Sequence, residues 1–63
     1  MDTTLEVLLR QYKDKRNQLA DAVSSGGAKD YAEYRALCGE IRGLLIAESY
    51  LTDLAKNLEN MDE

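Results

Sequence analysis

Few side chains in this 63-residue sequence could support chemistry. There is no histidine to act as a general base, and no serine stands at a strand-to-helix elbow beside a partner. Cys38 is the single cysteine, so no intrachain disulfide or cysteine-based zinc site can form, and we expect a reduced, buried thiol. The carboxylates are scattered. We therefore expect a protein that is not an enzyme and carries no metal or cofactor.

A basic cluster is the one group of charges dense enough to bind a ligand. Arg10, Lys13, Lys15 and Arg16 fall within seven residues. They form either a solvated helix face or a contact for a polyanion such as nucleic acid. The net charge of −4 argues against nonspecific nucleic-acid binding as the main role, so nucleic acid is the less favoured partner.

These residues must be positioned by two helices, because one breaker segment divides the chain. SSGG, Ser24 to Gly27, is that segment, and proline is absent. The sequence predicts an all-α fold: an antiparallel two-helix hairpin in one domain over residues 1–63, with a longer second helix. We expect helices over about 4–24 and about 29–60, joined by a turn over 24–28.

Capping residues support these boundaries. Thr3 and Glu6 have the spacing of a capping box at the start of the first helix. Gly26 or Gly27 suits the cap at its end. Asp30 is expected in the first turn of the second helix, where a negative charge suits the helix dipole.

The second helix carries a heptad series of core-type residues: Tyr34, Leu37, Ile41, Leu44, Glu48, Leu51, Ala55 and Leu58. Glu48 is the polar exception, and the hairpin geometry places it opposite Leu5. It either sets the register of the helices or lies where the hairpin opens to solvent. The second helix should extend past the first by two to three turns, leaving Tyr50, Leu51, Leu54 and Leu58 uncovered for a partner.

Small residues form a ridge on the opposite face of the second helix: Ala32, Ala36, Gly39, Gly43 and Ala47. Each mid-helix glycine costs about 1 kcal/mol relative to alanine. Such a ridge lets another helix approach closely, although a surface face also tolerates small residues without any partner. We expect the ridge and the uncovered end to form the interface.

The small size of the chain makes such an interface important for its stability. A chain this short buries only about 60% of its unfolded surface, so we expect oligomerisation or docking to supply stability. The N-terminus lacks the pattern of a signal peptide, and no apolar run approaches a membrane span. We therefore expect no membrane partner and synthesis in the cytoplasm.

The segment from Ala28 to Leu54 resembles a group of short helical proteins of tailed bacteriophages. The similarity rests on a Gly/Ser turn, then KDYAEYR, then CGEIRGL, then an aliphatic and acidic tail, over a little under half of the chain. In that group the gene tends to lie among the head and portal genes. The resemblance implies a virion protein, made in the cytoplasm of the bacterial host, that braces or decorates the capsid or portal region.

Two functions follow as hypotheses. The first is a structural interaction protein of a phage particle that binds a larger phage structural protein, copies of itself, or both. The alternative is a small regulator that forms a dimeric four-helix bundle and binds RNA or inhibits a host protein, by analogy of fold alone.

Overall fold

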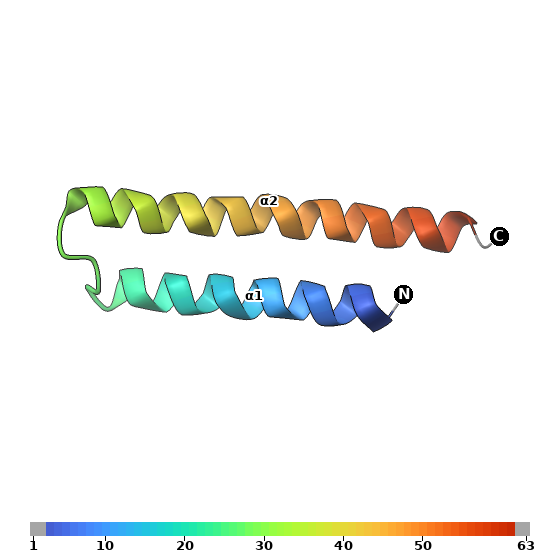
Figure 1. Cartoon of the computed structure of the whole chain (residues 1–63), viewed down its shortest axis with the longest axis horizontal. Coiled ribbons are helices and arrows are strands. Elements are labelled where there is room, and N and C mark those ends of the chain that lie inside the picture. Colours follow the sequence, from blue (N-terminus) through green and yellow to red (C-terminus); the bar gives the residue numbers. More distant parts are fainter. Residues whose placement is uncertain (1–2, 62–63) are drawn as a thin grey trace.

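The chain folds as two antiparallel helices joined by a short connection (Figure 1). The computed structural model describes residues 3–61, with α1 spanning Thr3–Ser24 and α2 spanning Tyr31–Met61. The helices pack against each other, and the molecule measures 51 × 15 × 12 Å. The predicted all-α hairpin with a longer second helix is confirmed.

A glycine cap ends α1. The Gly27 N–H donates to the Ala22 carbonyl at 2.7 Å and the Gly26 N–H donates to the Val23 carbonyl at 3.2 Å, the two bonds of a Schellman motif. Gly26 has a φ of +78°, which side chains other than glycine rarely adopt. Gly27 is required for space, because a Cβ there would lie 2.8 Å from the Ala22 carbonyl oxygen. The turn therefore uses both glycines.

Asp30 caps the start of α2. Its Oδ1 accepts a hydrogen bond from the Glu33 N–H at 2.8 Å, and its carbonyl accepts the first helical bond from the Tyr34 N–H at 3.0 Å. This is the preferred use of an aspartate at a helix N-terminus. Asp30 thus precedes the helix instead of lying inside its first turn. The connection consequently runs over residues 25–30, longer than expected.

The start of α1 also differs from expectation. Thr3 is already helical, so it does not occupy the capping position that the Thr3–Glu6 spacing predicted. The position before it lies outside the described residues. Glu6 remains in the first turn, where its charge suits the helix dipole.

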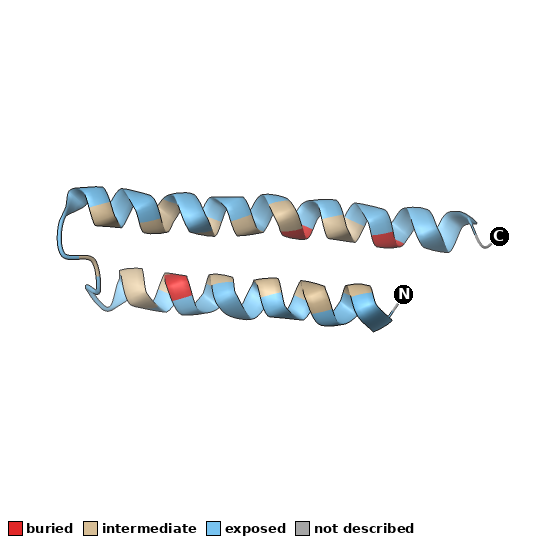
Figure 2. Cartoon of the chain, in the orientation of Figure 1, coloured by how far each residue is buried: buried red, intermediate tan, exposed pale blue. Residues whose placement is uncertain are grey.

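The interface between the helices is one narrow seam. In Figure 2 the half-buried and buried residues lie on the facing sides of the two ribbons. Among the described residues only Leu19, Glu48 and Ala55 are buried. Six members of the predicted series lie in the seam: Leu37, Ile41, Leu44, Glu48, Leu51 and Ala55. The two end members, Tyr34 and Leu58, are exposed, because the seam does not reach the ends of α2.

The unmatched length of α2 is divided between its two ends. Figure 1 shows α2 extending past α1 beside the turn as well as at the C-terminus. The longer connection allows this, since it lets α2 begin beyond the end of α1. Ala55 is only 3% exposed and Leu51 is half-buried, although both lie in the expected overhang. The C-terminal overhang is therefore shorter than expected.

The turn gives a direct stability test. We expect Gly26→Ala to lower the free energy of unfolding by about 1–2 kcal/mol, because alanine must then adopt a left-handed conformation. Gly27→Ala should also destabilise the hairpin, through its clash with the Ala22 carbonyl. Urea denaturation followed by circular dichroism measures both. Lys29→Ala, an exposed change in the same connection, is the control and should stay within about 0.5 kcal/mol.

Candidate functional site

A bidentate ion pair joins the middle of the two helices. Arg16 Nε donates to Glu48 Oε2 at 2.7 Å, and Arg16 Nη2 donates to Glu48 Oε1 at 3.1 Å. Glu48 is 8% exposed as a residue, so its carboxylate is largely withdrawn from water. The bond to Glu48 raises the pKa of the Arg16 guanidinium above its ordinary value. Paired planar groups of this kind give directional as well as charge recognition.

This pair distinguishes the two interpretations of Glu48. A carboxylate at the open end of the hairpin would face water, whereas this one is buried and bound across the seam. The observation matches the register-setting interpretation. The partner is Arg16, not the Leu5 region expected from a shorter turn.

The direction of the side chains explains how these two residues meet. Each helical side chain leans towards the N-terminus of its own helix, and the two helices run in opposite directions. Arg16 and Glu48 therefore lean towards each other along the seam. The sequence spacing placed Glu48 at a core-type position but did not include the reach of the arginine.

The basic cluster does not form one surface. Arg16 points into the seam and is bound to Glu48, whereas Arg10, Lys13 and Lys15 are exposed. Lys13 and Lys15 lie about 160° apart around α1 at 100° per residue. The structure brings together Arg10 and Lys13, which line a shallow hollow of about 300 Å³ with Glu6 and Leu9. That hollow combines both signs of charge.

One flank of α2 carries a continuous series of small and apolar residues, which we call the α2 stripe. It lies about 110° around the helix from the seam, instead of opposite the seam as the sequence predicted, and its sector also contains the polar residues Glu40 and Asn57. Its nine members lie within a sector of about 100° around the helix and run its full length: Ala32, Ala36, Gly39, Gly43, Ala47, Tyr50, Leu54, Leu58 and Met61. All are exposed except Ala47, which is half-buried. A Cβ added at Gly39 or Gly43 would meet no atom within 4 Å, so the glycine segment is open.

The α2 stripe contains eight of the nine interface residues predicted from the sequence. The exception is Leu51, which is half-buried in the seam. Met61 joins the stripe and is 78% exposed, while Tyr50 is 71% exposed. Two further exposed apolar residues, Leu45 and Ile46, were not predicted as interface residues. Ile46 lies beside the stripe. An apolar residue at a position outside the heptad series was the signal in the sequence that could have identified it as exposed.

A second exposed patch lies near the turn. The rings of Tyr31 and Tyr34 stack with centroids 6.2 Å apart, and the Arg35 guanidinium carbon lies 6.0 Å from the centre of the Tyr31 ring. A hydrogen bond with Cys38 is the main cause that raises the pKa of the Tyr34 hydroxyl. Cys38 is half-buried, less enclosed than expected. These four residues, with Gly39 and Arg42, line an open hollow of about 270 Å³.

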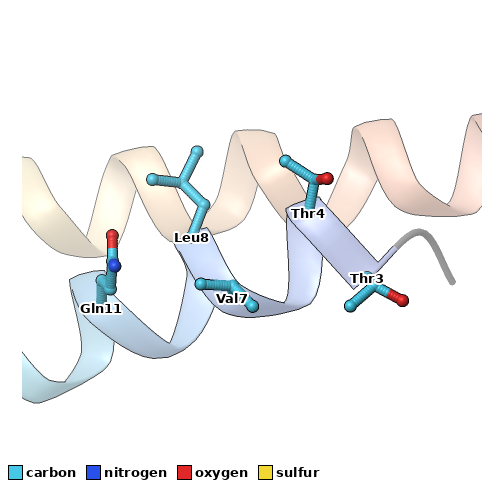
Figure 3. Close-up of a pocket in the computed structure, with 5 residues that line it drawn as sticks. All are labelled: Thr3, Thr4, Val7, Leu8 and Gln11. Carbon is cyan, nitrogen blue, oxygen red and sulfur yellow. The ribbon is translucent and has the colours of Figure 1, made fainter.

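A third patch occupies the start of α1 (Figure 3). Thr3, Thr4, Val7, Leu8 and Gln11 line an open hollow of about 360 Å³ without a charged side chain. Thr4 and Leu8 extend from α1 in the direction of α2, whereas Val7 lies across the outer side of its helix and is exposed. The uncharged surface of the hairpin therefore includes part of α1.

No three His, Cys, Asp or Glu side chains of residues 3–61 gather as metal ligands. Neither helix of this segment has the apolar length that a membrane crossing requires. The exposed apolar surfaces described above are the candidate site of residues 3–61.

Comparison of the chain with protein-family models, with curated proteins and with solved structures found no match. The resemblance to phage proteins stays a prediction from the sequence.

The ion pair makes a prediction that a double-mutant cycle can test. Arg16→Met should lower the urea midpoint most, because it leaves the Glu48 carboxylate without a cation, and the Glu48 side chain is 10% exposed. Glu48→Leu should cost less, since the Arg16 side chain is 27% exposed and can reach water. The double variant should recover most of the loss. Purely additive losses would contradict a coupled pair, and Lys15→Met serves as the exposed control.

Proposed function

We propose that this chain is a non-enzymatic interaction protein that binds protein surfaces through α2, as a structural component of a tailed-phage particle. In that setting it braces or decorates the capsid or portal region, in contact with a larger structural protein, copies of itself, or both. Its place of action is the virion, after synthesis in the host cytoplasm.

The observation that carries the proposal is the open α2 stripe. Soluble monomers rarely expose a long contiguous apolar surface, and such surfaces usually mark interaction sites. The stripe combines exposed anchors, Tyr50 and Met61 among them, with glycines over which another helix can pack closely. The resemblance of residues 28–54 to phage proteins supports the particle as the setting.

The extended shape supports docking as well. The radius of gyration is 14.8 Å, compared with about 11 Å for a compact domain of this length. A rod of this form exposes side chains that a compact fold would cover. It therefore gains from lying against a second surface.

The RNA-binding alternative receives less support from the geometry. Arg16 is held in the seam, and Lys15 lies on a different side of α1 from Lys13. What remains is the Arg10–Lys13 pair beside the Glu6 carboxylate. A salt-dependent gel shift with RNA, lost in the Lys13→Ala variant, would favour the alternative over the proposed function.

Incorporation into particles tests the proposal. We expect quantitative mass spectrometry of purified phage particles to detect the wild-type chain in a fixed ratio to the capsid proteins. Gly39→Leu and Gly43→Leu should abolish incorporation while leaving helicity intact, since both side chains enter open space in the hairpin. Ser49→Leu, an exposed change on another side of α2, should be incorporated normally.

Two results would contradict the proposal. One is absence of the wild-type chain from washed particles. The other is normal incorporation of both glycine variants, which would exclude the α2 stripe as the attachment surface.

A further inference from the structure

The α2 stripe has a repeat and a gradient of side-chain size. Its members follow one another at steps of 4, 3 and 4 residues, so each position recurs after 11 residues. Ala32, Gly43 and Leu54 form one such set. An 11-residue repeat has 3.67 residues per turn, close to the 3.6 of a straight helix, so the stripe follows the helix axis. The half beside the turn carries only Ala and Gly, and the other half carries Tyr, Leu and Met.

This gradient makes the stripe complementary to itself when two copies run antiparallel. A twofold axis near Ala47 places Tyr50 of one copy against Gly43 of the other. The same operation places Leu54 against Gly39, Leu58 against Ala36 and Met61 against Ala32. Every large side chain then faces a residue with little or no side chain. A parallel pair would instead set large residues against each other at one end and leave a gap at the other.

The charges along one edge of the stripe are compatible with the same orientation. Arg35 and Arg42 lie on this edge in the half beside the turn, and Asp53 lies on it in the other half. In the antiparallel register Arg42 of one copy is level, within about one residue, with Asp53 of the other. The twofold axis generates this opposite-charge pair twice.

The exposed area fits an interface of ordinary size. The chain exposes 4861 Å², whereas a folded monomer of 7.1 kDa exposes about 4,100 Å² on the usual scaling with mass. The excess of about 800 Å² is close to what one partner buries in a standard protein–protein interface. The area that the elongated hairpin leaves exposed is therefore sufficient for a dimer interface.

From the size gradient, the edge charges and the excess area together, we propose that the occupant of the α2 stripe is a second copy of this chain, forming a twofold antiparallel dimer through α2. The inference deepens the proposed function, because it rests on α2 as the protein-binding face and identifies its first partner. The dimer is isologous, so both stripes are covered at once. The stacked rings of Tyr31 and Tyr34 lie outside the stripe and stay available for a larger assembly, whereas Gly39 and Arg42 at the rim of their hollow belong to the dimer interface.

Solution mass is the first test. Analytical ultracentrifugation should give twice the monomer mass for the wild type, and the monomer mass for Gly39→Leu with its helicity unchanged. Ser49→Leu is the matched control and should remain dimeric, since Ser49 lies about 120° from the centre of the stripe. A monomer mass for the wild type at about 1 mM, the weak end of specific association, would overturn the proposal.

Charge reversal tests the register without altering the packing. Arg42→Asp or Asp53→Arg alone should weaken dimerisation roughly three- to tenfold, because each places like charges together. The double reversal should restore the wild-type constant. Weakening in the double variant equal to the sum of the single effects would overturn the proposed register.

Disulfide trapping tests the orientation. In a Cys38→Ser background, a mixture of Gly39→Cys and Leu54→Cys chains should give the mixed disulfide on mild oxidation, since these positions face each other in the antiparallel dimer. Either chain alone should give little. Efficient disulfide formation by Gly39→Cys alone would indicate a parallel pair and overturn the proposal.

The outcomes separate the dimer from the proposed function. A dimeric chain that is absent from phage particles would leave the dimer standing and contradict the proposed function. A chain that is incorporated into particles but remains monomeric in solution and cannot be trapped would do the opposite.

Discussion

Glu48 brings a carboxylate into the seam between the two helices, and a carboxylate in that position requires a cation and hydrogen-bond donors. Arg16 supplies both through two bonds from the other helix. Apolar contacts along a narrow seam tolerate sliding, because neighbouring turns present similar side chains. An ion pair of defined geometry does not, since any shift leaves the carboxylate without its partner. The register of the hairpin therefore depends on this interaction, and the register decides which part of α2 remains uncovered.

Two helices alone cannot enclose a core. Each helix has one neighbour, so only one side of it is covered, and just three described residues are buried. The seam accounts for the register but leaves large apolar side chains in water along the rest of α2. A second surface is then the natural source of stability, and the folded population rises with the concentration of whatever binds. Fold and binding are linked in this chain because the same helix serves both.

The sequence predicted the hairpin because its signals are local and strong: one Gly/Ser breaker segment and one heptad series. It misplaced the start of α2, because Asp30 can serve either inside a first turn or as the cap before it. It also separated the small-residue ridge from the apolar end of α2. Heptad positions drift around a straight helix, so a lettering of period 3.5 assigns Gly43 and Leu54 to different faces, although they lie about 20° apart. The partner of Glu48 depended on the length of the turn and the reach of Arg16, which no pattern within one helix contains.

The role of Gly39 and Gly43 follows from their place in the gradient of side-chain size along the α2 stripe. Gly39 and Gly43 each cost about 1 kcal/mol of helix propensity, and nothing in the hairpin requires them, since a Cβ at either position meets open space. A ridge of small residues alone would admit many partners in either direction. A ridge that continues into Tyr50, Leu54, Leu58 and Met61 specifies both the shape and the direction of its partner. The lost helix propensity is then offset because a large side chain of the second copy packs against the backbone at each glycine. A parallel orientation is disfavoured, because it leaves a gap at one end of the stripe and a clash at the other.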